Sequence, residues 1–206
     1  MNKNKIYLLA MVMILGFSYW SLSTQNLPTP SGPGRHLSLN TNVDIREVGS
    51  MTFRCYDIQG NLKWEEIDRP NNLADEGEHL FLDVTLRNGS APSNYFLRLY
   101  NVSPTETSNL TSLATYEPTT NGYAAQTVER NNTGWPTLAL DSGDYQAISS
   151  VETFSASGGS WGPVTYCVVA TSTDSSGKLV SYVALSTPRT LASGESLQVT
   201  YKLKLQ

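Results

Sequence analysis

Residues 196–206, SLQVTYKLKLQ, alternate apolar and polar side chains from the first position to the last. The apolar set is Leu197, Val199, Tyr201, Leu203 and Leu205. Successive side chains of a β-strand point to opposite faces, so this period of two predicts a strand with one buried face and one solvated face. Strands of this kind are typical of antiparallel sheets that cover a core on one side only.

Upstream of this strand, short segments rich in Thr, Tyr, Val and Leu recur at close spacing. Turn-forming pairs such as Asn121-Gly122 and Ser193-Gly194 separate them. We expect strands at residues 95–100, 122–130, 137–140, 145–156, 163–171 and 179–185. Many short strands with turns between them are typical of all-β domains.

A strand pair also opens the domain, after apolar side chains on odd positions between residues 37 and 45. Met51, Phe53 and Cys55 alternate with polar residues, and the chain then turns over residues 57–61 and returns through Leu62 and Trp64. The predicted fold is therefore mainly β, an antiparallel β-sandwich or jelly roll over residues 36–206.

One helix is expected within this domain, at about residues 73–87. Apolar side chains in LADEGEHLFLDVTLRNG, residues 73–89, lie at helical spacing, and three acids crowd its first turns. Asn71 and Asn72 are candidate N-caps, and Gly89 is placed to end the helix. Gly77 costs up to about 1 kcal/mol in a helix relative to Ala, so we expect it to mark a kink or close packing.

The first 23 residues indicate a signal peptide or a membrane anchor. Lys3 and Lys5 precede residues 6–20, IYLLAMVMILGFSYW, which carry no charge and predict an N-terminal apolar helix. Such a helix spans about 22 Å, less than the ~30 Å hydrocarbon core, which favours a cleaved signal. Extension to residue 22, with Tyr19 and Trp20 at an interface, favours a retained anchor instead.

The chain is thus expected to be exported, or anchored in a membrane through residues 6–22. Residues 24–35, TQNLPTPSGPGR, then predict a Pro/Gly-rich spacer, because such a stretch sustains neither a helix nor a sheet.

Composition restricts the function. The chain has 206 residues, 39% apolar and 16% charged, with a net charge of −4. Nucleic-acid binding needs clustered Lys and Arg, which this chain lacks. Its two histidines have no neighbouring ligand or nucleophile at a useful spacing, so we expect no catalytic residue, cofactor or metal, and no enzyme activity.

Four residues remain as candidates for special roles. Cys55 and Cys167 are a candidate disulfide if the chain is exported, and the alternative is two buried free thiols. Trp135 and Trp161 lie among Gly and Pro in expected loops. Exposed, they would contact a ligand or partner as stacking platforms; buried, they would fill the ends of the sandwich.

Several strings resemble a group of small structural proteins of tailed bacteriophages. They include LADEGE at 73–78, APSNYFLRLY at 91–100, GWPTL at 134–138, GGSWGPV at 158–164 and the closing residues 186–206. The similarity covers about residues 50–206. It implies a β-rich tail, fibre or capsid-decoration module that works by packing and display rather than by catalysis.

We therefore expect a non-enzymatic structural or assembly protein displayed on a virion, filament or cell surface. Its expected partners are copies of itself or other structural subunits, with membrane contact through the N-terminal segment. The alternative is an exported, adhesin-like module that recognises glycans or a surface receptor. This alternative rests on the apolar leader and on Trp135 and Trp161.

Overall fold

A computed structural model describes residues 47–205 of the chain. The predicted signal peptide or anchor, the spacer and the alternation between residues 37 and 45 lie outside the described residues. Within residues 47–205, no helix combines the length and the apolar character needed to cross a membrane.

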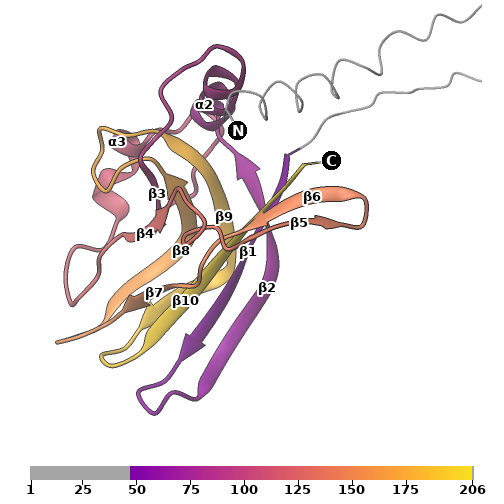
Figure 1. The fold of residues 1–206 in the computed structure, drawn as a ribbon. Helices are drawn as coiled ribbons and strands as arrows, with labels where there is room; N and C mark the ends of the chain where they lie inside the picture. Colours follow the sequence, from indigo (N-terminus) through magenta and orange to yellow (C-terminus); the bar gives the residue numbers. More distant parts are fainter. Residues whose placement is uncertain (1–46, 206) are drawn as a thin grey trace, which may run out of the picture. The chain divides into compact units, whose positions relative to one another are not determined.

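The described domain is mainly β, as predicted, and its strands pair antiparallel (Figure 1). The strands are β1 (Glu47–Tyr56), β2 (Leu62–Leu73), β3 (Asn94–Tyr100), β4 (Gln126–Glu129), β5 (Thr137–Asp141), β6 (Asp144–Ile148), β7 (Glu152–Ser155), β8 (Trp161–Ala170), β9 (Leu179–Leu191) and β10 (Ser196–Leu205). The helical segments are α2 (Asp75–Leu86), α3 (Leu110–Leu113) and the 3-10 turn η1 (Ala114–Tyr116).

Instead of two separate sheets, the strands form one hydrogen-bonded sheet in the order β4-β3-β8-β9-β2-β1-β10-β6-β5, with β7 also paired to β10. The sheet curls so that its two halves share a core. The long strand β2 makes this possible: its residues 62–70 pair with β1, whereas its last three residues pair with β9. Strands that pass between two packed layers form the corners of such folds.

The corner in β2 is built by side chains as well as by backbone. Asp68 has a positive φ of 49°, and the register between β1 and β2 shifts at this point. The Asp68 carboxylate accepts hydrogen bonds from Lys202 at 2.8 Å and from Ser50 at 3.2 Å. Three residues later, Asn71 accepts a 2.8 Å hydrogen bond from the backbone N–H of Gly49. These contacts fix the bend to β1 and β10.

The core is filled by the inward faces of both halves. The alternation in β10 is confirmed, since Leu197 and Val199 are fully buried and Tyr201 nearly so, while Leu205 at the strand end is exposed. They pack against residues of the other half such as Leu97 in one continuous cluster. The period of two therefore identified the side that faces the core.

Helix α2 confirms the predicted helix, but its start differs. Asn71 and Asn72 belong to β2 and pair with β9, so they do not cap the helix. Ala74 is the N-cap residue and makes no side-chain cap. At the other end Asn88, with a φ of 59°, takes the left-handed position, and Gly89 donates its N–H to the carbonyl of Asp83.

Two other segments differ from the sequence prediction. Residues 110–116 form α3 and η1, although only one helix was expected in the domain, and α3 starts at a capping box made by Asn109 and Ser112. The expected strand at 145–156 divides into β6 and β7, because Ser149 exchanges hydrogen bonds with the backbone of Tyr201 at 2.8 and 2.9 Å. This contact replaces regular pairing between the two segments.

Gly77 is the closest contact between α2 and the sheet. A Cβ at this position would lie 2.1 Å from the carbonyl oxygen of Val180 in β9, so close packing rather than a kink explains the glycine.

Replacing a helical glycine by alanine normally stabilises the helix. For Gly77→Ala we instead expect a loss of about 1–3 kcal/mol in the free energy of unfolding, measured by urea denaturation, because the added methyl group overpacks this contact. Thr85→Ala, on the exposed side of α2, is the control and should change little. An equal or higher stability of Gly77→Ala would contradict this packing.

A buried carboxylate couples β2 to the end of β9. Glu66 accepts hydrogen bonds from the backbone N–H of Ser186 at 2.7 Å and from the Arg189 guanidinium at 2.8 Å. Burial alone would raise the pKa of Glu66, but Arg189 and Ser186 outweigh it and hold the pKa below its usual value.

The lowered pKa predicts an acid-sensitive contribution to stability. Above the pKa of an unfolded Glu, about 4.3, the contribution is complete, and it is lost as the pH falls through the lower folded value. We expect the free energy of unfolding to fall between about pH 5 and pH 3, and to fall less steeply in Glu66→Gln. Denaturation curves across this range test the prediction, and identical slopes in both proteins would refute it.

Candidate functional site

Trp161 lies inside the core rather than in an exposed loop. It is the first residue of β8 and 3% exposed, and its indole N–H donates to the carbonyl of Ser155 at 3.1 Å. Its ring meets Tyr123 edge-on at 5.5 Å between centroids. At 3% exposure Trp161 cannot act as an open stacking platform.

Trp135 occupies a second, separate place. It lies in the segment between β4 and β5, is half-buried, and packs edge-on between Tyr95 and Tyr201 at 6.2 and 5.9 Å. Together with side chains such as Phe81 and Leu203 it lines an apolar groove of about 270 Å³. The structure does not bring the two tryptophans into one site.

Cys55 in β1 and Cys167 in β8 are both buried and unbonded in the structure. Burial raises the pKa of each thiol, at Cys55 with a smaller contribution from the charge of Glu195. Neutral thiols are poor nucleophiles and metal ligands, so the two residues serve here as core side chains. Within the described residues, no group of three or more His, Cys, Asp or Glu side chains could hold a metal ion.

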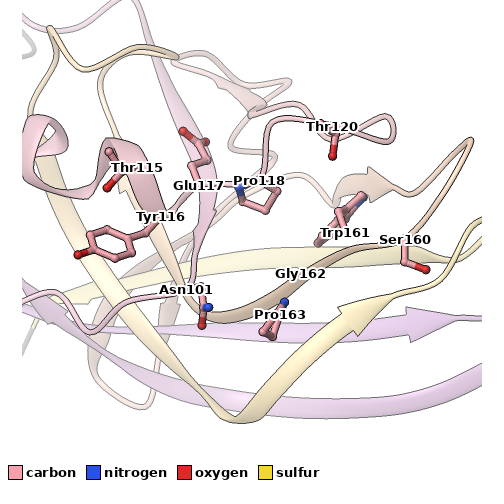
Figure 2. A pocket seen from close by; sticks show the side chains of 10 residues that line it. All are labelled: Asn101, Thr115, Tyr116, Glu117, Pro118, Thr120, Ser160, Trp161, Gly162 and Pro163. Atoms are coloured by element: carbon pink, nitrogen blue, oxygen red, sulfur yellow. The ribbon is translucent and has the colours of Figure 1, made fainter.

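The pocket beside Trp161 is lined by polar side chains and has a volume of about 300 Å³. Figure 2 shows Pro118 and Thr120 on one side, Asn101 and Pro163 on the other, and Tyr116 at the end far from Trp161. These residues come from the end of β3, from η1 and the segment that follows it, and from the start of β8. We call it the polar pocket.

A buried ion pair holds one wall of the polar pocket. Arg98 in β3 is 2% exposed, and its Nε donates to Glu117 at 3.0 Å. The same carboxylate accepts from the hydroxyl of Tyr123 at 2.7 Å, and Arg98 also donates to the carbonyl of Asp174 at 2.7 Å. Burial, followed by the charge of Glu117, raises the pKa of Tyr123, so this hydroxyl stays a donor.

The second feature is an exposed apolar surface on the β5–β6 hairpin. Leu138, Leu140 and Tyr145 are 75%, 62% and 63% exposed. Register places Leu138 opposite Ala147 and Leu140 opposite Tyr145, so all four side chains share one face, which we call the hairpin face. Figure 1 shows this hairpin extending from the sheet on the side away from β3 and β4.

The hairpin face continues into the apolar groove. Ala147 lies opposite Leu203 of β10, and both residues line the groove beside Trp135. The other face of the hairpin is polar, since Lys204 there approaches Asp141 at 3.3 Å and Asp144 at 3.7 Å. Beyond β5 no further strand is paired within the described sheet, so its edge is open. An open edge beside an apolar face is a typical surface for contact with another chain.

Comparison with protein families identifies the domain that carries these features. The family model of the podophage GP4 fiber I protein gp80 matches residues 72–204, more than half of the chain. The chain belongs to this family. The match runs from the end of β2 to the end of β10 and includes the polar pocket and the hairpin face. No curated protein matches the sequence.

The match confirms the resemblance to structural proteins of tailed phages. Each of the two tryptophans that the sequence singled out lines one of two separate pockets in this gp80-family domain. Sequence reasoning did not select Tyr116 or Asn101 as site residues: no motif surrounds Tyr116, and Asn101-Val-Ser matches only the glycosylation acceptor pattern. The spacing of Asn109 and Ser112 does indicate a helix start close by. Leu138 and Leu140 were assigned to a strand, but alternation alone does not tell whether a neighbour covers them.

The ion pair gives a direct test of the pocket wall. Glu117→Gln leaves the Arg98 charge buried without a counter-charge, and we expect a loss of about 3–5 kcal/mol in the free energy of unfolding. The control is Glu65→Gln, which breaks an exposed pair with Arg54 and should cost less than about 1 kcal/mol. Urea denaturation measures both, and equal losses would contradict a structural role for the buried pair.

Proposed function

We propose that this protein is a structural subunit of a phage fibre, displayed on the virion and working by packing against neighbouring structural subunits, without catalysis. Membership of the gp80 family carries the proposal, because the matched region is the folded domain itself. The predicted leader and spacer would set the domain away from its point of attachment. Whether the leader is cleaved or retained stays a prediction.

The hairpin face is the surface we assign to this packing. Its three large apolar side chains lie in water in the isolated domain, and burying such side chains gains about 1.5–3 kcal/mol each. A neighbouring subunit would cover them and extend from the open β5 edge. The acidic pair Asp141 and Asp144, on the other face, would stay solvated.

Particle composition tests the proposal. Mass spectrometry of purified phage particles, together with immunogold electron microscopy, should find the protein on the virion at a fixed copy number. Its absence from particles purified to constant composition would refute the structural assignment. Mass spectrometry of the N-terminal peptide in the same sample would show whether Met1 is retained.

A charge placed on the hairpin face tests the packing surface. We expect Leu140→Glu to fold normally and to lower incorporation into particles at least tenfold, because a carboxylate would be buried against the neighbour. Ala139→Glu adds the same charge to the same strand on the opposite face and is the matched control. Quantitative mass spectrometry of particles measures incorporation, and equal incorporation of both variants would exclude the hairpin face.

A second candidate function is recognition of a glycan or surface receptor, as an adhesin-like module would do. One observation favours it, namely the polar pocket with the exposed ring of Tyr116 at its end. The two functions are compatible, because they use different surfaces of the domain.

A further inference from the structure

The polar pocket holds polar groups that the fold does not use. Its side chains with a free hydroxyl or amide are Asn101, Thr115, Tyr116, Thr120 and Ser160. None of these side chains makes a hydrogen bond with another residue in the described part of the chain, 47–205. Hydroxyls and amides both donate and accept, so the pocket offers both kinds of partner to a ligand.

Charge excludes several ligand classes. Glu117 is the one ionisable carboxylate in the lining, and it is neutralised by Arg98 and occupied by the Tyr123 hydroxyl. An anionic ligand such as a phosphate would meet no free cation in the lining, and a metal ion would meet no free carboxylate. The lining therefore favours a neutral ligand.

The same pocket also offers apolar surface. Tyr116 is 47% exposed, and Pro118 and Pro163 lie on opposite sides of the pocket (Figure 2). A sugar ring presents hydroxyl groups at its edge and C–H groups on its faces, and this combination matches a pocket with an aromatic ring at one end and hydroxyls and an amide elsewhere in its lining (Figure 2). A volume of about 300 Å³ is at the lower end of the range for ligand pockets and suits one sugar residue.

The backbone around the pocket is held in place before any ligand binds. The backbone N–H of Asn101 donates to the carbonyl of Tyr116 at 3.0 Å, which joins β3 to η1. On the other side, the Asn121 amide donates to the carbonyl of Ser160 at 2.5 Å, and Asn121 accepts from the N–H of Ser157 at 2.8 Å. A preorganised site loses less entropy on binding than a mobile one.

The polar pocket and the hairpin face lie toward opposite ends of β10. Trp161 pairs with Leu191, just before the turn that leads to Ser196 at the start of β10. The tip of the β5–β6 hairpin lies toward the other end of β10, because Gln146 pairs with Lys204. We therefore expect that contact through the hairpin face and binding in the polar pocket use separate surfaces.

We propose that the polar pocket binds a neutral saccharide, with the Tyr116 ring against one face of the sugar and the Asn101 amide bonded to its hydroxyls. This inference rests on the second candidate function above and gives it a site and a ligand class. Trp161 lines the pocket at the end far from Tyr116, and the proposal includes no stacking on its ring (Figure 2). The site thus differs from an exposed tryptophan platform, one of the two alternatives that the sequence left open.

Saturation-transfer NMR on the purified full chain tests the proposal. The probes are glucose, galactose, mannose, rhamnose and N-acetylglucosamine, with glucose 6-phosphate as the anionic comparison. We expect transfer to at least one neutral sugar and weaker transfer to the phosphate. Tyr116→Ala should weaken binding about tenfold, whereas Tyr116→Phe should keep most of it, because the ring supplies the main contact.

Tyr145→Ala is the matched control, since it removes another exposed tyrosine, from the hairpin face, and should leave sugar binding unchanged. Thermal unfolding would verify that every variant is folded. Absence of transfer to all five sugars, or unchanged binding in both Tyr116→Ala and Asn101→Ala, would overturn the proposal. Incorporation of Tyr116→Ala into particles reports separately on the structural function, so the failure of one proposal is distinguishable from that of the other.

Discussion

The fold depends on a single strand that changes partners. Strand β2 bonds to β1 through most of its length and to β9 through its last three residues, so it joins the two halves of the sheet. Asn71 strengthens the corner by bonding to Gly49 and, at 3.1 Å, to the hydroxyl of Tyr201. This corner determines how the sheet curls, and with it the shared core and the position of α2 against β9.

The buried pair of Arg98 and Glu117 organises the opposite side of the domain. A guanidinium that is 2% exposed requires a counter-charge and several acceptors, and these come from segments far apart in the sequence. Satisfying Arg98 therefore positions η1, the segment around Asp174 and Tyr123 at once. The Tyr123 ring then stacks on Phe154 at 5.9 Å and meets Trp161. The hydrogen-bond partners that the buried Arg98 needs thus fix the positions of loops at the domain surface.

Sequence reasoning succeeded where a local rule decides the outcome. Period two located β10 and the buried side of β1, because each side chain follows from its neighbours in the strand. It failed where partners lie far apart. Asn71 was expected to cap a helix but bonds to Tyr201, 130 residues away. Whether Trp161 is exposed or buried was left open by the sequence, and it is decided by Tyr123, which packs against its ring. The polar pocket was missed for the same reason, since Tyr116 and Pro163 are far apart in the sequence and line one pocket only in the fold.

Strand β5 has a consequence for how such a protein is handled before assembly. It is held by one neighbour, its apolar side chains are uncovered, and its outer edge offers unpaired backbone, so isolated subunits carry a surface prone to aggregation. Its length of five residues and the acidic turn at its end limit this hazard. The same short hairpin thus limits solubility and provides a surface for joining a larger structure. The concentration of free subunits would decide whether they stay soluble or associate.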